Sequence, residues 1–152
     1  MKFSKIKLED FPAWKQMRIE LYSALDNDYH NEEMETINSS DQWYCRLIKN
    51  DADEVMGIIE ISYRNIVDGC ISSPVPYIEG LYLYPQYRRN GYGTEILKMI
   101  VTWCKKQGYT ELATDAQIIN TKAHKFYLSS GFEETDRVVE FRMVLSGNKQ
   151  HP

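Results

Sequence analysis

Residues 75–93 read VPYIEGLYLYPQYRRNGYG and predict a strand, a short turn and the first turn of a helix. Positions 75–84 are rich in β-branched and aromatic residues, which favour a strand. Pro85 ends that strand because it has no N–H to donate to a neighbouring strand. After the turn, apolar residues recur at helical spacing over positions 96–104. The sequence therefore predicts a glycine-rich turn held between a strand and a helix.

The turn carries Arg88 and Arg89, followed by Gly91 and Gly93. Glycines at the start of a helix let a ligand approach the backbone, and the free N–H groups there attract an anion. Ile96 stands in place of the third glycine of a dinucleotide-binding motif, and the Gly-Lys-Ser/Thr of a P-loop is absent. The turn is expected to bind the phosphate of another kind of ligand, the alternative being an ordinary helix start.

The pattern R-x-x-G-x-G after a strand resembles the acetyl-CoA site of the GNAT superfamily of N-acetyltransferases. In that family the amides of this turn hold the CoA pyrophosphate, and an asparagine at the start of a later helix also contacts CoA. Gly80, inside the strand, indicates either a bulge or a packing glycine. In the family, amides after such a bulge meet the thioester carbonyl. The resemblance thus implies acetyl-CoA as co-substrate, with contacts at Leu81, Tyr82, Leu83, Arg88, Arg89, Asn90, Gly91, Tyr92, Gly93, Thr94 and Asn120.

Three residues are candidates for the proton transfers of acetylation. Glu79 is the one charged residue of positions 75–84 and a candidate base, with pairing to an arginine as the alternative. Asp115, at the end of the next predicted strand, is the second candidate base. Tyr127 lies four residues before Gly131, where the family has a tyrosine near the CoA sulfur, so it is the candidate acid. No cysteine lies in a motif for a covalent relay, and direct transfer in a ternary complex is expected.

A single domain is expected over residues 1–146, followed by a disordered tail over residues 147–152. The predicted order of elements is β-α-α-β-β-β-α-β-α-β, which favours a mixed α/β fold (α+β by some schemes) with helices on both faces of the sheet. The GNAT resemblance adds a splayed pair of parallel strands. The predicted strands are Lys2–Leu8, Trp43–Lys49, Val55–Tyr63, Val75–Tyr84, Glu111–Thr114 and Val138–Leu145. The predicted helices follow Asp10, span Asn31–Ile37 after a polar break at Asp26–His30, follow the glycine turn, and run from Asn120 to Ser130.

Composition narrows the possible partners and the compartment. The net charge of −4 argues against non-specific nucleic-acid binding, which depends on a basic surface, and favours a cationic partner. Cys45, Cys70 and Cys104 have neither metal-ligand nor disulfide spacing, which favours a reducing compartment. The first ten residues do not resemble a signal peptide, and no apolar run approaches the ~20 residues of a membrane span. We expect a cytoplasmic protein without a membrane segment or a metal site.

Four segments are similar to those of the chromosomal-type aminoglycoside 6'-N-acetyltransferases, namely Gly69–Val75, Glu79–Pro85, Ala113–Ala116 and Gly131–Val138. This resemblance places against the acceptor Tyr22, Leu25, Ile66, Glu79, Asp115 and Asp136. At the first three of these positions the subfamily usually has tryptophan, histidine and tyrosine. The chemistry is therefore expected to be kept, while the range of drugs stays open.

Two other functions fit the same sequence. One is a GNAT enzyme for another amine, such as a polyamine, an amino sugar or a peptide N-terminus, and the other is a non-catalytic CoA-binding sensor. The similar enzymes are dimers, and the predicted strand Val138–Leu145 lies near an edge of the sheet, where a partner strand can pair. A homodimer is therefore expected.

Overall fold

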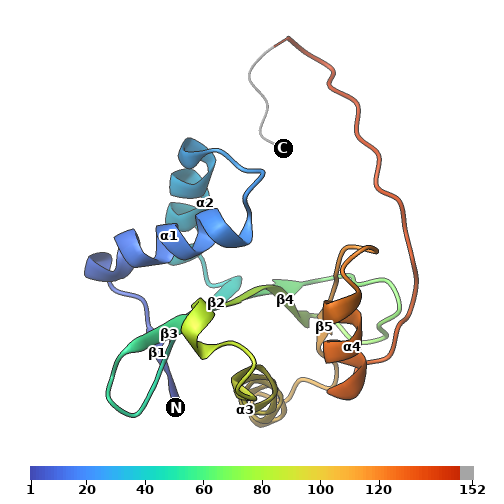
Figure 1. Ribbon diagram of the computed structural model, residues 1–152. Coiled ribbons are helices and arrows are strands. Elements are labelled where there is room, and N and C mark those ends of the chain that lie inside the picture. Colours follow the sequence, from blue (N-terminus) through green and yellow to red (C-terminus); the bar gives the residue numbers. More distant parts are fainter. Residues whose placement is uncertain (148–152) are drawn as a thin grey trace.

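The structure, a computed structural model, describes residues 1–147 and contains a five-stranded sheet with strand order β1-β2-β3-β4-β5 (Figure 1). Neighbouring strands are antiparallel except β4 and β5, which are parallel. The predicted mixed sheet is confirmed. The strands are β1 (Lys2–Lys5), β2 (Trp43–Lys49), β3 (Val55–Arg64), β4 (Val75–Leu83) and β5 (Ala113–Thr114). The helices are α1 (Phe11–Leu21), α2 (Asn27–Ser39), α3 (Tyr92–Lys106) and α4 (Thr121–Ser129), with short 3-10 turns at Leu8–Asp10 and Pro85–Tyr87.

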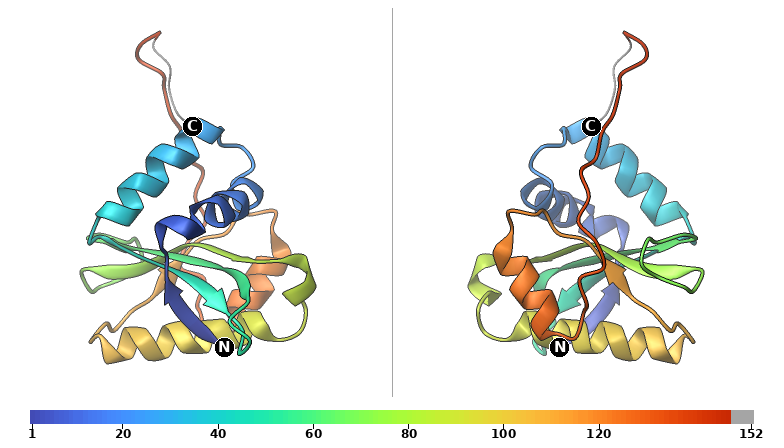
Figure 2. Two further views of the ribbon diagram at one scale, coloured as in Figure 1. Left: turned by 90° about the vertical axis from the view of Figure 1, so that its left-hand side faces the viewer. Right: turned by 90° about the vertical axis from the view of Figure 1, so that its right-hand side faces the viewer.

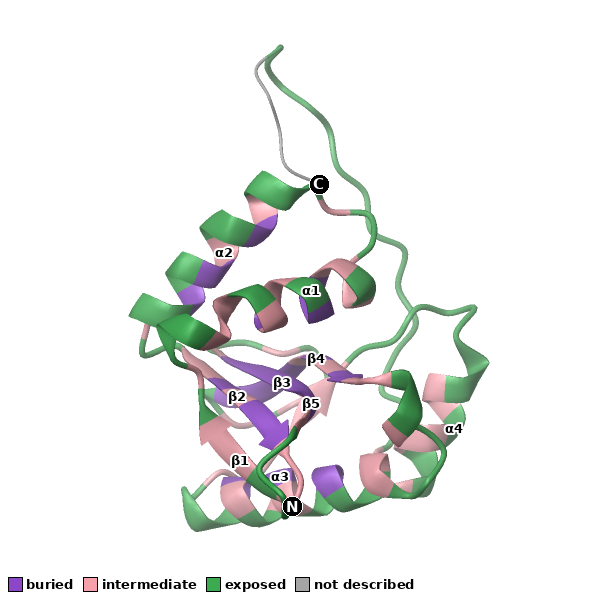
Figure 3. Cartoon of the chain, turned by 60° about the vertical axis from the view of Figure 1, so that its left-hand side comes forward, coloured by how far each residue is buried: buried purple, intermediate pink, exposed green. Residues whose placement is uncertain are grey.

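The helices cover both faces of this sheet (Figure 2). On one face, Trp14 of α1 and Met34 of α2 pack with Ile58 of β3 in one apolar cluster. On the other face, Ile100 of α3 packs with Ile59, the next residue of the same strand. Successive side chains of a strand point to opposite faces, so β3 is apolar at both kinds of position. The central strands are accordingly the most buried part of the chain (Figure 3).

Helix α2 begins earlier than predicted, so the polar break at Asp26–His30 is wrong. The Asp26 side chain accepts a hydrogen bond from the backbone N–H of Tyr29 at 2.7 Å and caps the helix, whose first residue is Asn27. Asn27 and Asp28, two of the residues that suggested a loop, lie on the exposed side of the first helical turn, whereas His30 is buried. An aspartate before a polar helix is a start signal as well as a loop signal.

The C-terminal arm, residues 133–147, differs most from the prediction. The predicted strand Val138–Leu145 is absent, because these described residues run away from the sheet without pairing with it (Figures 1 and 3). The predicted strand Glu111–Thr114 is reduced to the two residues of β5. A strand needs a partner for its backbone N–H and C=O groups, and alternation alone does not supply one. The large apolar residues that the arm exposes are Val138, Val139, Phe141, Met143, Val144 and Leu145.

Two further expectations concern the limits of the chain. The predicted disordered tail, residues 147–152, lies outside the described residues apart from Gly147. The single domain over residues 1–146 stays a prediction. Within residues 1–147 no helix is long and apolar enough to cross a membrane.

Candidate active site

Strand β4 contains a bulge at the place that Gly80 indicates. Gly80 pairs with Glu60 of β3, but the next pair joins Ile61 to Ile78, so Glu79 is the extra residue. A side chain at position 80 would not fit, because its Cβ would lie 2.2 Å from the hydroxyl of Tyr22. The glycine therefore makes room for Tyr22 beside the bulge, and both interpretations of Gly80, the mark of a bulge and a packing glycine, describe this geometry.

The parallel strands separate directly before this bulge. Their pairing consists of Tyr77 with Ala113 and Ile78 with Thr114, and it does not extend to Glu79. The Thr114 hydroxyl donates to the Ile78 carbonyl at 3.0 Å and closes the end of the paired region. The predicted splayed pair is thus present, and the backbone of β4 after the bulge is free of a β5 partner.

A pocket of about 290 Å³ lies in the opening between the two strands. It brings together Glu79, Asp115 and Tyr127, the three predicted catalytic residues, with Leu81 after the bulge and Asn120 at the start of α4. These five residues are distant in sequence and come from β4, α4 and the loop between β5 and α4. The remaining wall is formed by Leu21, Ile78, Gly80, Thr114, Ala116, Ala123 and Phe126.

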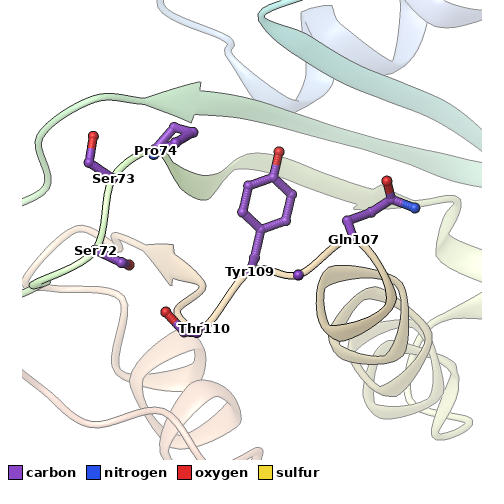
Figure 4. Close-up of a pocket in the computed structure, with 7 residues that line it drawn as sticks. Ser72, Ser73, Pro74, Gln107, Tyr109 and Thr110 are labelled. Atoms are coloured by element: carbon purple, nitrogen blue, oxygen red, sulfur yellow. The ribbon is translucent and has the colours of Figure 1, made fainter.

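A larger hollow, of about 420 Å³, lies between the loop before β4 and the segment after α3 (Figure 4). Ser72, Ser73 and Pro74 form one side, and residues 107–110, including Tyr109, form the other. None of the predicted catalytic or cofactor residues lines it. Volume alone is therefore a poor guide to the reaction site in this protein.

Glu79 is engaged by a hydroxyl group and by a guanidinium. Ser62 donates to Oε1 at 2.6 Å, while Arg64 donates from Nε to Oε1 and from Nη2 to Oε2, both at 2.9 Å. The guanidinium also lies over the ring of Tyr77, 3.6 Å from its centroid. The alternative interpretation of Glu79, a pair with an arginine, therefore describes this geometry.

Asp115 acts electrostatically on two tyrosines. Burial raises the pKa of Tyr77, and the charge and hydrogen bond of Asp115 add to this effect. Burial also raises the pKa of Tyr127; a hydrogen bond with Thr114 opposes that increase, and the charge of Asp115 adds to it. Tyr127 therefore keeps its proton at neutral pH, as a proton donor must. Asp115 itself is exposed at the end of β5.

The predicted phosphate-binding turn has the geometry of an anion site. Gly91 precedes α3 with a φ of 81°, no side chain caps the helix, and the place of a Cβ at position 91 is open. The first amides of α3 are therefore available to a ligand. Arg88 donates to the Leu83 carbonyl at 2.8 Å and so lies back along the strand, whereas Arg89 is exposed with a φ of 60°. These residues fit the pyrophosphate of CoA.

Asn120 caps α4, because its side chain accepts a hydrogen bond from the Ala123 N–H at 3.2 Å. It also lines the pocket. The two interpretations of Asn120, helix cap and ligand contact, are compatible. Gly93 lets α4 approach the start of α3, since a Cβ there would lie 3.2 Å from the Phe126 ring.

The structure brings fewer of the predicted acceptor residues to the pocket than the resemblance implies. Asp136 lies on the exposed arm and accepts a hydrogen bond from the adjacent Arg137 N–H at 2.7 Å. Ile66 is exposed in the loop before β4, and Leu25 lies in the turn between α1 and α2. None of the three lines the pocket. The predicted cluster of Asp136 with Glu79 and Asp115 around one cleft is not formed within this single chain.

Tyr22 is fixed by its hydroxyl group, which was not foreseen. That oxygen lies 3.1 Å from the Glu79 carbonyl at the bulge and 3.2 Å from Glu60 Oε2. Burial, and then the charge of Glu60, raise the pKa of Tyr22. Tyr22 therefore stays protonated and joins the end of α1 to the bulge.

A buried ionic network lies behind the bulge and was not predicted from the sequence. Arg18 Nη1 donates to both oxygens of Glu60 at 2.6 Å, and the Trp14 indole N–H donates to Oε1 at 2.8 Å. Arg18 also pairs with Glu33. Two signals could have revealed it: Arg18 stands on the apolar side of its helix, and Glu60 interrupts an apolar strand.

Comparison with known proteins identifies the family. Residues 11–132 match the acetyltransferase (GNAT) family. An aminoglycoside N(6')-acetyltransferase type 1 of Stenotrophomonas maltophilia is 37% identical over 138 residues, 90% of this chain and 88% of the relative. One of Serratia marcescens is 31% identical over 138 residues, 90% and 94% of the two chains. The solved structure of AAC(6')-Iy in complex with the bisubstrate analogue CoA-S-monomethyl-acetylneamine has a TM-score of 0.82 at 28% identity, and the match covers 94% of this chain and 97% of that one. This chain therefore belongs to the GNAT family of acetyltransferases.

Proposed function

We propose that this protein transfers the acetyl group of acetyl-CoA to the 6'-amine of aminoglycosides by direct transfer in a ternary complex. The observation that carries this proposal is the pocket at the splayed strands, where two carboxylates and a tyrosine converge beside the bulge. The relatives named as aminoglycoside N(6')-acetyltransferases, at 31–37% identity over most of the chain, support the choice of acceptor.

Acetyl-CoA supplies the activated acetyl group, and the chain supplies its binding and the proton transfers. The amides at the start of α3, with Arg89, would hold the pyrophosphate, and the amide of Leu81 after the bulge would donate to the acetyl carbonyl. Fixed donors of this kind stabilise charge that develops on an oxygen. Tyr127 would give its proton to the departing thiolate. The free N–H groups of the turn and the protonated state of Tyr127 support these roles.

Asp115 is the better placed of the two candidate bases. An ammonium group cannot attack a thioester, so a carboxylate must first take its proton. The oxygens of Glu79 already accept hydrogen bonds from Ser62 and Arg64. Asp115 is exposed on the other side of the pocket. We assign proton removal to Asp115 and acceptor binding to both carboxylates.

The experiment is an acceptor screen with acetyl-CoA, in which a thiol dye follows the release of CoA. Kanamycin and tobramycin are expected to stimulate release, and NMR of the product should locate the acetyl group on the 6'-nitrogen. Asp115→Asn is expected to lower kcat/KM for the acceptor by about 10²–10⁴-fold, the usual worth of general base catalysis, with little change in the KM of acetyl-CoA. Asp41→Asn, an equal change in an exposed turn outside the pocket, is the matched control.

Two results would contradict this function. Release of CoA with spermidine or a peptide, but with no aminoglycoside, would show that another amine is the acceptor. Slow CoA release that no amine stimulates would identify a CoA-binding protein without transferase activity. Full activity of the Asp115→Asn variant would remove Asp115 from the mechanism and leave Glu79 as the base.

We also propose that the protein is a homodimer in which the C-terminal arm of each copy packs on the other. The arm exposes large apolar residues at alternate positions, Val139, Phe141, Met143 and Leu145, as a strand with one buried side would. The far edge of β5 is unpaired within residues 1–147. An unpaired edge and an unpaired apolar segment are complementary.

Light scattering tests this assembly. The expected mass is twice the chain mass of 17.9 kDa. Phe141→Asp should shift the protein toward the monomer, whereas Leu8→Asp, which changes an equally exposed apolar residue far from the arm in the sequence, should not. A wild-type mass equal to that of one chain at micromolar concentration would contradict the dimer.

The free cysteines Cys45, Cys70 and Cys104 further support a place in the reducing cytoplasm.

A further inference from the structure

A cation lies beside one of the acidic residues that line the acceptor pocket. Arg64 lies beside Glu79, and its Nε and Nη2 donate to the two carboxylate oxygens at 2.9 Å each. A guanidinium that binds both oxygens of a carboxylate occupies the positions that an incoming ammonium group would use. Ser62 takes a further position on Oε1 at 2.6 Å. An acceptor therefore meets a carboxylate that is already neutralised.

Two features relate this guanidinium to the pocket, although neither Arg64 nor Tyr77 is one of the residues that line it. It lies 3.6 Å from the centroid of the Tyr77 ring, and the charge of Asp115 adds to the effect of burial in raising the pKa of Tyr77, so Asp115 lies near the same ring. Arg64 thus binds Glu79 directly and stacks on a ring that lies near Asp115. The planar guanidinium suits this arrangement because it can stack on a ring while its edge binds a carboxylate.

The pair is also exchangeable, unlike the buried pair of Arg18 in α1 with Glu60 in β3. The side chains of Arg64 and Glu79 are 43% and 23% exposed, whereas Arg18 and Glu60 are each 1% exposed. Arg64 is the last residue of β3, and the loop of residues 65–74 follows it. Water can solvate the guanidinium if it leaves Glu79, so displacement costs little.

We propose that Arg64 is a specificity-determining residue that competes with the acceptor for Glu79 and so selects polycationic acceptors. This inference rests on the proposed function. A tethered guanidinium has a high effective concentration, which a single ammonium group in solution cannot match. An acceptor with several ammonium groups can bind Asp115 with one of them and displace Arg64 with another. The arginine thereby disfavours small monoamines.

The test compares Arg64→Gln with Arg46→Gln. Arg46 also lies over an aromatic ring of the sheet, 4.0 Å from the centroid of Tyr44, and its replacement removes the same charge without removing a partner of Glu79. Initial rates are measured with kanamycin, with spermidine and with methyl 6-amino-6-deoxyglucoside, which has one ammonium group. Thermal unfolding of each variant checks that the fold is kept.

Arg64→Gln is expected to lower the acceptor KM by about two- to fivefold, the worth of a partly exposed ion pair, and the KM of acetyl-CoA should not change. The decrease should be larger for the monoamine than for kanamycin. Arg64→Lys keeps the charge but loses the planar guanidinium, so its acceptor KM should lie between those of the wild type and Arg64→Gln. Arg46→Gln should resemble the wild type.

An acceptor KM that rises or stays constant in Arg64→Gln would overturn the inference, because Arg64 would then support or ignore the acceptor. An equal decrease in Arg46→Gln would overturn it as well, since the effect would be one of net charge. Turnover of spermidine alone, with a lower KM in Arg64→Gln, would refute the aminoglycoside acceptor and uphold the role of Arg64. A wild-type protein that acetylates none of the three acceptors would refute both.

Discussion

Replacing Arg18 by methionine is expected to reduce the free energy of unfolding by about 3–4 kcal/mol at pH 7 and by less at lower pH. The side chains of Arg18 and Glu60 are both 1% exposed, and Arg18 Nη1 lies 2.6 Å from Glu60 Oε2. Methionine is similar in length, so the loss concerns the charge rather than the packing. Removal of one partner leaves the other as an uncompensated charge in the interior, which typically costs about 3–5 kcal/mol.

The loss in the free energy of unfolding has an upper limit, because the unpaired carboxylate can take a proton. Without Arg18, Glu60 keeps the donors Trp14 Nε1 and the Tyr22 hydroxyl, but it has lost the buried cation. Such a carboxylate can become neutral by taking a proton, and this costs about 3.7 kcal/mol at pH 7 for a glutamate of ordinary acidity. The remaining partner of Arg18, Glu33, is 26% exposed and can be solvated by water.

Protonation also fixes the sign of the pH dependence. In the Arg18→Met variant the folded state holds a proton on Glu60 that the unfolded state has released at neutral pH. Because the folded state then binds more protons than the unfolded state, stability falls as pH rises, by up to about 1.4 kcal/mol per pH unit above pH 5. The deficit relative to the wild type should therefore be larger at pH 7.5 than at pH 5.5.

Urea denaturation followed by circular dichroism at these two pH values measures the effect. The double variant Arg18→Met/Glu60→Gln supplies the control, because an amide keeps the shape and an acceptor oxygen without the charge. It should regain much of the lost stability, and its difference from the wild type should depend less on pH. The reasoning is refuted if the deficit of Arg18→Met is equal at both pH values, or if the double variant is less stable than the single one.

Three further perturbations have expected outcomes. Gly91→Asp should abolish CoA binding in calorimetry, since it puts a carboxylate at the anion site. The control is Gly108→Asp, which imposes similar backbone strain, with a φ of 89°, at the other end of α3. This control variant should bind CoA normally. Tyr127→Phe should lower kcat about 10²-fold or more and change both KM values little, and a normal kcat would exclude Tyr127 as the acid. His30 is fully buried, its ring nitrogens have no hydrogen-bond partner among the described residues, and burial lowers its pKa. The unfolded state thus binds more protons at acidic pH, so His30→Leu should raise stability by about 1 kcal/mol at pH 7.5 and by more at pH 5.5; equal gains would refute this.

Sequence patterns predicted those parts of the fold that depend on local backbone chemistry. A glycine inside an apolar strand indicated the bulge at Gly80, because glycine is unfavourable in the interior of an ordinary strand. The helix starts at Gly91 and Asn120 were found for a similar reason, since each residue satisfies or frees backbone groups at a defined position. Residues close in sequence settle such features, so one sequence suffices to locate them.

Features that depend on distant partners were not predictable in this way. Arg18 and Glu60 are separated by 42 positions, and the charge of each is tolerated only because the other is present. Glu79 lines the pocket, but a pair with an arginine was one of two interpretations of it, and only the register of β3 and β4 identifies that arginine as Arg64. The predicted strand Val138–Leu145 was wrong because a strand requires a partner strand as well as an alternating sequence. The described residues offer it no such partner.

The two ionic pairs divide the work of the site between a fixed part and an adjustable part. The buried pair Arg18–Glu60 holds the Tyr22 hydroxyl against the carbonyl of Glu79, so the backbone of the bulge has little freedom to move. The side chain of that same Glu79 points instead to the half-exposed Arg64, whose exchange with a ligand costs little. Geometry at the acetyl group demands precision, because misplacement of reacting atoms by about 1 Å can cost about 10²-fold in rate. Acceptor binding demands adaptability, since drugs differ in the placement of their ammonium groups. Precision and adaptability thus meet at a single residue, Glu79. The core holds its backbone carbonyl in place, while its side-chain carboxylate can exchange Arg64 for a ligand.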